Sequence, residues 1–113
     1  MFLTLEQLKK AGLLRAYGMS TKTIEGGLLT LEHADLAMVT YNIDHTEEEA
    51  VIQYAAAHQK GILIKKAFGS GHIKNISAAL DFILKNQGVS SVIVGTINPG
   101  HLEYNAQCAM GAC

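Results

Sequence analysis

The sequence predicts an α/β fold in which four strand–helix units build one parallel sheet, and two observations support this prediction. Four short apolar runs are nearly continuous rather than alternating, which is typical of strands covered on both faces. Stretches of helical periodicity separate them, and many of the 11 glycines follow an apolar run or a helical stretch. Crossovers of this length are right-handed and place consecutive strands parallel. The predicted strands are residues 13–17, 36–41, 62–64 and 89–94.

The first two helices differ in how clearly the sequence marks them. A leading helix is expected at residues 5–10, and Gly12 is expected to end it. The second helix, at residues 23–32, has a weaker signal. Gly26 and Gly27 lie inside it, and each costs about 1 kcal/mol against alanine in a helix.

The third helix has the clearest signal. Thr46 followed by Glu49 forms a capping box at its start, and Gly61 is expected just past its end. Its predicted inward face consists of Ala50, Val51, Tyr54, Ala55 and His58. Two further helices are predicted, one at residues 77–86 with Gly88 as its stop, and one that begins near Pro99.

Consecutive predicted strands start about 25 residues apart, a spacing that two architectures share. One is a small doubly wound sheet, and the other is half of an eight-fold (β/α)8 barrel. No linker, low-complexity tract or charge block divides residues 1–113, so we expect one compact piece. The spacing alone leaves both architectures open.

Length and composition exclude several classes of function. The chain has 113 residues, of which 49% are hydrophobic and 17% are charged, and this excludes a disordered chain. Nine basic and ten acidic side chains give a net charge of −1, which argues against nucleic-acid and anionic-membrane partners. No apolar run reaches about 18 residues and no signal peptide is evident, so a reducing cytoplasm is expected. Cys108 and Cys113 are too few for a disulfide framework and are expected to be free thiols.

The loops after the third and fourth strands are the strongest candidates for a ligand site, because functional loops follow the carboxyl ends of parallel strands. The run Gly69-Ser70-Gly71 allows backbone N–H groups to approach a phosphate. The segment Gly95-Thr96 leads into a helix that Asn98 and Pro99 begin, and a helix N-terminus attracts anions. In the alternative interpretation, the glycines only make turns and the Asn-Pro pair only caps a helix.

Other reactive groups give weaker signals. Lys65 and Lys66 end a strand and point to opposite faces, so one of them is expected on the ligand side; alternatively, both lie in solvent. His45 with Glu47 and Glu49 invites a metal-site interpretation, but acidic residues are favoured in the first turn of any helix. No serine or cysteine is placed with a histidine and a carboxylate as a nucleophile would be. We therefore expect no metal site and assign no catalytic residue.

Four segments, in matching order and spacing, resemble the aldo/keto reductase family. Residues 12–20 (GLLRAYGMS) resemble the fifth strand of the family, and residues 39–42 (VTYN) resemble the sixth. Residues 65–71 (KKAFGSG) are similar to the glycine-rich turn after the seventh strand. The eighth strand and its cofactor-binding loop resemble residues 89–96 (VSSVIVGT), followed by Asn98-Pro99, His101-Leu102-Glu103 and Asn105.

This resemblance implies that residues 1–113 are a single partial domain, the C-terminal half of a (β/α)8 TIM barrel with parallel strands. It implies the cofactor-binding half of an NAD(P)(H)-dependent oxidoreductase that reduces carbonyl groups to alcohols when complete. The family's catalytic Asp, Tyr, Lys and His come from its second to fourth strands. No residue of this chain is therefore assigned to them, and no activity is expected from the chain alone. The alternatives are a non-catalytic nucleotide-binding or structural remnant of the barrel, and an unrelated doubly wound binding domain.

The resemblance also implies which residues contact the cofactor, for which NADP is expected and NAD is the second option. Ser20 would contact the nicotinamide carboxamide, with Thr21 beside it where the family usually has Asn. The pyrophosphate would be lined by Gly69, Ser70 and Gly71. The adenosine-side phosphate would be held by Gly95, Thr96 and Asn98, and the adenine would contact Asn105. Near the 2′-phosphate, His101 stands where the family commonly has Arg or Gln. The chain also departs from the family at Met38 (often Gln), at Lys65 or Lys66 (often aromatic) and at Tyr104 (acidic).

A half-barrel leaves two open edge strands and an inner face without its opposing strands. A second copy related by a two-fold axis would pair with the two edge strands and provide the opposing strands. We therefore expect a homodimer or a complex with a complementary half-barrel. The expected small-molecule partner is a nicotinamide dinucleotide, with neither nucleic acid nor a membrane.

Overall fold

The computed structural model describes residues 2–69, 74–96 and 98–110. In this part of the chain helices and strands alternate, in the order α1 (Phe2–Lys10), β1 (Gly18–Ser20), α2 (Ile24–His33), β2 (Leu36–Thr40), α3 (Glu49–His58), β3 (Gly61–Lys65), α4 (Ile76–Leu84), β4 (Ser91–Val92) and α5 (Pro99–Ala109). None of the described helices is long and apolar enough to cross a membrane.

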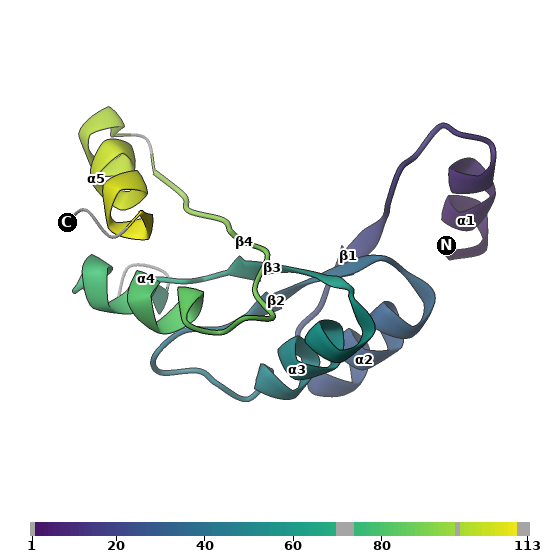
Figure 1. The fold of residues 1–113 in the computed structure, drawn as a ribbon, viewed down its shortest axis with the longest axis horizontal. Coiled ribbons are helices and arrows are strands. Elements are labelled where there is room, and N and C mark those ends of the chain that lie inside the picture. The colour runs from purple at the N-terminus through teal and green to yellow at the C-terminus, as the bar shows by residue number, and fades with distance from the viewer. Residues whose placement is uncertain (1, 70–73, 97, 111–113) are drawn as a thin grey trace.

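The strand order decides between the two predicted architectures. The four strands are all parallel and lie in the sheet in the order β1-β2-β3-β4, which is their order in the chain. A doubly wound sheet reverses its strand order at a switch point and carries helices on both faces. Here the helices follow one another along an arc, and the sheet turns its other face to the inside of that arc (Figure 1). The fold is therefore a fragment of a (β/α)8 barrel.

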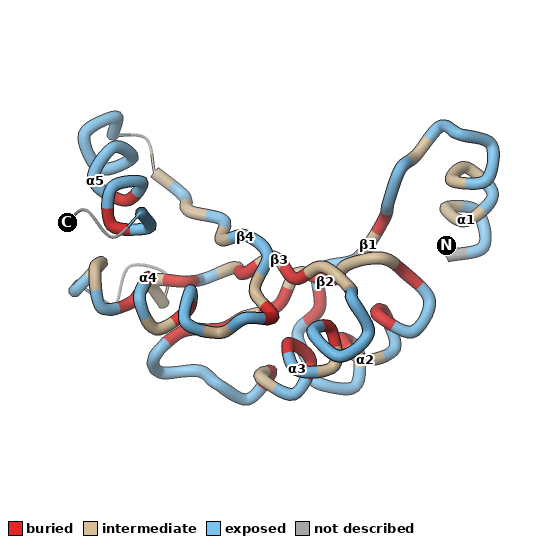
Figure 2. Tube along the Cα trace, in the orientation of Figure 1, coloured by how far each residue is buried: buried red, intermediate tan, exposed pale blue. Residues whose placement is uncertain are grey.

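The core lies between the two central strands and the helices, on one face of the sheet only. Ala37 and Val39 of β2 and Ile62 and Ile64 of β3 are fully buried, together with Leu31, Val51, Ile52 and Ile83 from the helices. The strand residues between them are only half-buried and face the inside of the arc. Figure 2 shows this concentration of buried residues around β2 and β3. The expectation that both faces of the strands are covered is therefore wrong for the inner face.

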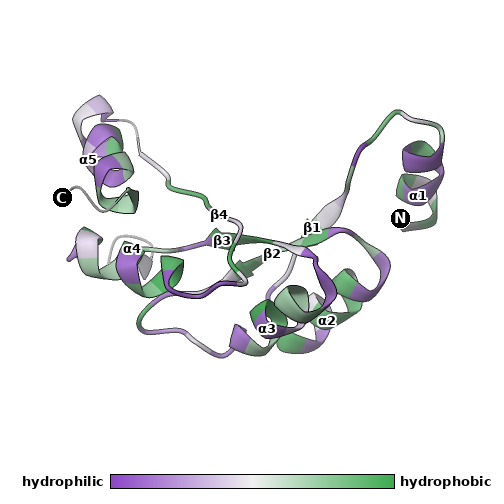
Figure 3. Cartoon of the chain, viewed as in Figure 1, coloured by the Kyte–Doolittle hydropathy of each residue, from purple (hydrophilic) through white to green (hydrophobic). Residues whose placement is uncertain are grey.

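The open inner face enlarges the molecule. The chain exposes 7179 Å², whereas a compact monomer of this mass exposes about 6,000 Å². Its radius of gyration is 15.0 Å, compared with about 13 Å for a compact domain of this length. Hydrophobic segments run along the strands that border this open space (Figure 3). About 1,200 Å² of surface is thus exposed beyond what a closed domain of this size would leave.

The two edge strands are shorter than the sequence predicted. The first strand was expected at residues 13–17 but β1 is Gly18–Ser20, and Leu13 is 72% exposed. A parallel strand needs a partner in register, and β2 begins only at Leu36, which pairs with Gly18. Among the described residues, no strand lies opposite residues 13–17. At the other edge β4 is only Ser91–Val92, because β3 is its single partner.

The start and end of α3 also differ from the prediction. Its N-cap residue is Glu48, which makes no side-chain cap hydrogen bond, so the capping box predicted at Thr46 does not form. The helix ends at Gln59 in a left-handed conformation (φ 57°), and Gly61 belongs to β3. The predicted inward face is confirmed for Val51 and Ala55 and wrong for Ala50 and His58, which are exposed, while Ile52 is buried instead.

Other helix boundaries follow local sequence signals. The N–H of Gly12 (φ 81°) donates to the Lys9 carbonyl at 3.0 Å and ends α1 as predicted. Asn98 caps α5 with Pro99 at its first position, which is also as predicted.

The prediction of free thiols is wrong for Cys108, which is disulfide-bonded; Cys113 lies outside the described residues.

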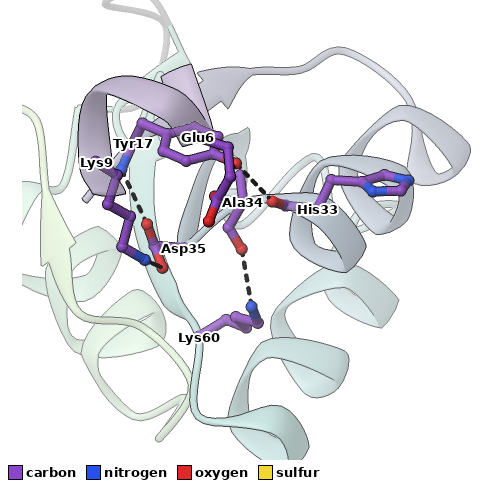
Figure 4. Close-up of polar contacts among 7 residues, drawn as sticks. All are labelled: Glu6, Lys9, Tyr17, His33, Ala34, Asp35 and Lys60. Carbon is purple, nitrogen blue, oxygen red and sulfur yellow. Dashed lines mark hydrogen bonds and ion pairs between the residues drawn. The ribbon is translucent and has the colours of Figure 1, made fainter. Parts of the chain in front are cut away.

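One polar cluster fastens α1 to the amino end of β2 (Figure 4). The Lys9 ammonium lies 2.7 Å from Asp35 Oδ1, and the Tyr17 N–H donates to Asp35 Oδ2 at 3.1 Å. The Tyr17 hydroxyl lies 2.8 Å from both Glu6 Oε2 and the His33 carbonyl oxygen. The hydrogen bond from Lys9 lowers the pKa of Asp35 below its ordinary value of 3.8. Asp35 therefore links helix, loop and sheet through one carboxylate.

We expect Asp35→Asn to lower the melting temperature by a few degrees at neutral pH, since an amide has one acceptor oxygen and cannot form the ion pair with Lys9. A depressed carboxyl pKa stabilises the fold fully above the unfolded value of 3.8. The stabilisation is lost as the pH falls through the lower pKa of the folded state. The difference between the two proteins should therefore shrink below pH 4 in thermal scans. Asp81→Asn, at an exposed position of α4, is the matched control and should show no such pH dependence.

Candidate functional site

The carboxyl ends of all four strands lie at one edge of the sheet, where barrels place their sites. The described candidate residues form two groups along this edge. One group follows β1 and β3 and contains Ser20, Thr21 and Lys65, whereas the other follows β4. Three strand spacings of about 4.8 Å separate β1 from β4, so Ser20 lies roughly 14 Å along the sheet from the end of β4, whereas Lys65 belongs to β3, the neighbour of β4.

The group at the end of β1 is organised around Lys65. This residue alternates with the buried Ile64 and pairs in register with Thr40, so it lies on the inner face. Its ammonium donates to Ser20 Oγ at 2.8 Å. The prediction that one of the two lysines faces the inside is therefore confirmed for Lys65, while Lys66 is exposed in a left-handed conformation (φ 57°).

Glu48 is a buried acid at this edge that the sequence did not single out. Its Oε2 accepts a hydrogen bond from the Thr40 N–H at 3.2 Å, and the side chain is only 6% exposed. Its Oε1 and the Thr21 hydroxyl are buried without a partner among the described residues. Burial raises the pKa of Glu48, and the hydrogen bond from the Thr40 N–H and, to a smaller extent, the positive charge of Lys65 partly oppose this shift. In the sequence, three consecutive glutamates indicated only the first turn of a helix.

A cavity of about 220 Å³ lies at the group that follows β4. It is lined by Phe68, Ile76, Gly95, Thr96, His101, Tyr104 and Asn105. Four of these residues were predicted from the sequence to bind the cofactor: Gly95, Thr96, His101 and Asn105. Drug-sized ligands occupy pockets of about 300–1,000 Å³, so this cavity suits one heteroaromatic ring rather than a whole dinucleotide. Three of its side chains are aromatic rings on which a base could stack.

Asn98 does not leave the start of α5 open to an anion. Its Oδ1 accepts hydrogen bonds from the N–H groups of Gly100 (2.8 Å) and His101 (3.2 Å). The Leu102 N–H donates to the Asn98 carbonyl at 3.1 Å, and Pro99 has no N–H. Asn98 therefore caps α5, as both interpretations of the sequence expected. A phosphate reaches these N–H groups only by displacing the Asn98 side chain, a cap worth about 1 kcal/mol.

The glycine-rich turn is described only in part. Gly69 has a left-handed φ of 60°, and its N–H donates to the Lys66 carbonyl at 2.9 Å. Ser70 and Gly71, both predicted to line a pyrophosphate, lie outside the described residues. Within the described ranges, no group of three His, Cys, Asp or Glu residues is arranged to hold a metal ion.

The fold and this edge define a class of protein: a partial (β/α)8 barrel with a ring-sized cavity between the segments that follow its last two strands. Two solved structures of a Pseudomonas aeruginosa protein assigned to the aldo-keto reductases match 97% of this chain at 51% sequence identity and a TM-score of 0.90. No protein-family model and no curated protein matches the chain. On this similarity the chain belongs to the aldo/keto reductases as a partial member. It spans only 42% and 43% of the two matching chains.

Proposed function

We propose that this chain is the cofactor-binding half of an aldo/keto reductase-type oxidoreductase that reduces carbonyl groups to alcohols when complete. The observation that carries the proposal is the cavity after β4, where four residues assigned to cofactor binding from the sequence converge. The cofactor, NADP or NAD, would supply a hydride. The residues of this chain would bind and orient it.

The two groups of residues at the sheet edge would bind opposite ends of the cofactor. The aromatic cavity would take the adenine, with the nearly buried amide of Asn105 as its polar contact. His101 would lie beside the adenosine-side phosphates. At the other end, Ser20 would contact the nicotinamide carboxamide. The histidine in place of the family's arginine leaves NAD as an alternative to NADP.

A second candidate function is a nucleotide-binding or structural remnant without chemistry. The two candidates agree on the cavity and differ in whether a further protein segment completes the site.

Adenosine phosphates should bind at the β4–α5 cavity. In an NMR titration with ADP we expect shifts at the amides of Thr96, His101 and Asn105. Tyr104→Ala should weaken binding about tenfold, since base–aromatic stacking contributes about 1–3 kcal/mol per base. Gln107→Ala, on the same helix but outside the cavity, is the control and should bind like the wild type. Shifts confined to α1–β2, or none at millimolar ADP, would contradict this assignment.

The chain alone should not reduce aldehydes with NADPH. Positioned proton transfer typically contributes about 10²–10⁴-fold to such reactions, and no residue here is assigned to it. Steady-state assays of the purified chain should therefore give the rate of the buffer control. A turnover that persists through repurification and falls in the Ser20→Ala variant would show that the chain has its own chemistry.

A second copy of the chain is our proposed occupant of the open inner face. A two-fold axis would set β4 of one copy beside β1 of the other and close an eight-stranded ring. The excess exposed surface of about 1,200 Å² is larger than the ~800 Å² per partner of a standard stable interface. The two edge strands also offer unpaired backbone groups.

We expect sedimentation equilibrium at micromolar concentration to give a dimer. Leu63→Asp, on the inner face, should shift the equilibrium toward monomer, because it places a charge in the interface. Leu29→Asp, at an exposed position of α2, should leave it unchanged. A wild-type monomer with a sharp thermal transition and no binding of a hydrophobic dye would refute the proposal. Higher aggregates that persist in Leu63→Asp would refute it as well.

A further inference from the structure

Lys65 places a positive charge inside the arc at the sheet edge. Its ammonium donates to Ser20 Oγ at 2.8 Å. Its partner in register, Thr40, and the next pair on the same face, Met38 and Leu63, are uncharged. Within the described ranges the ion pair formed is Lys9–Asp35, so Lys65 has no ion-pair partner there. The charge of Lys65 acts on the pKa of Glu48, whose buried carboxylate accepts a hydrogen bond from the Thr40 N–H.

We propose that Lys65 makes the site select the reduced over the oxidised nicotinamide cofactor. This inference rests on the proposed function, in which Ser20 contacts the carboxamide. The oxidised ring carries one positive charge and the reduced ring carries none, while the phosphates and riboses are the same in both. A fixed cation beside the ring therefore repels only the oxidised form.

In this arrangement the Lys65 ammonium would lie close to the positive charge of the oxidised nicotinamide ring. A carboxamide hydrogen-bonded to Ser20 Oγ lies about 3 Å from that oxygen, and the Lys65 ammonium lies 2.8 Å from the same oxygen. The ring centre is then no more than about 9 Å from the ammonium. That separation is close to one Debye length at physiological salt, so the repulsion is felt but depends on ionic strength.

The test compares dissociation constants for NADP⁺ and NADPH by calorimetry at low salt, with no turnover required. We expect the wild type to bind NADPH about three- to tenfold more tightly. Lys65→Met keeps the aliphatic stem and removes the charge, and its ratio should fall to about one. Lys66→Met makes the same change in net charge at the exposed neighbouring residue and should keep the wild-type ratio. Circular dichroism checks that each variant is folded.

Ionic strength provides a second measurement that needs no variant. The wild-type ratio should fall toward one as salt is raised to about 0.5 M, because screening weakens the repulsion. A ratio of one in the wild type, a ratio that persists in folded Lys65→Met, or a ratio insensitive to salt would each overturn the inference. Failure of both cofactor forms to bind at millimolar concentration would instead refute the proposed function, and the inference with it.

Discussion

The pairing of β2 with β3 is the constraint on which the rest of the structure depends. These strands share five residue pairs in parallel register, from Leu36–Gly61 to Thr40–Lys65. The register sets two faces: one carries the buried side chains that hold α2, α3 and α4, and the other carries Lys65 into the arc. The edge strands pair only where this central ladder gives them a partner. The positions of both groups of candidate residues therefore depend on the β2–β3 pairing.

Sequence predicted the parts of the fold that local chemistry determines. The two central strands and the Asn98-Pro99 start of α5 have local signals, namely apolar runs and capping residues, and they were located well. The edge strands were misplaced because a strand's ends depend on its neighbours rather than on its own hydrophobicity. The start of α3 was misplaced because packing overrode a capping box.

The same distinction applies to the candidate site. Part of the cavity could be predicted, because Gly95, Thr96, His101 and Asn105 follow one strand and are close in sequence. The remaining lining includes Phe68 and Ile76, which follow β3 and reach the cavity only through tertiary packing. Two further features could not be predicted: the Lys65–Ser20 hydrogen bond joins residues 45 positions apart, and Glu48 became buried only through tertiary packing. Sequence also allowed two roles for Asn98, and only the hydrogen bonds show that its side chain already holds the helix N–H groups.

Hydrogen exchange of the chain with and without NADPH tests the central claim most directly, because it observes both ends of the sheet edge at once. If the chain binds one dinucleotide along this edge, amide exchange should slow together at the end of β1 and at the start of α5. Protection at neither place, or protection only at α1 and α3, would contradict the account of this half-barrel as a cofactor-binding unit.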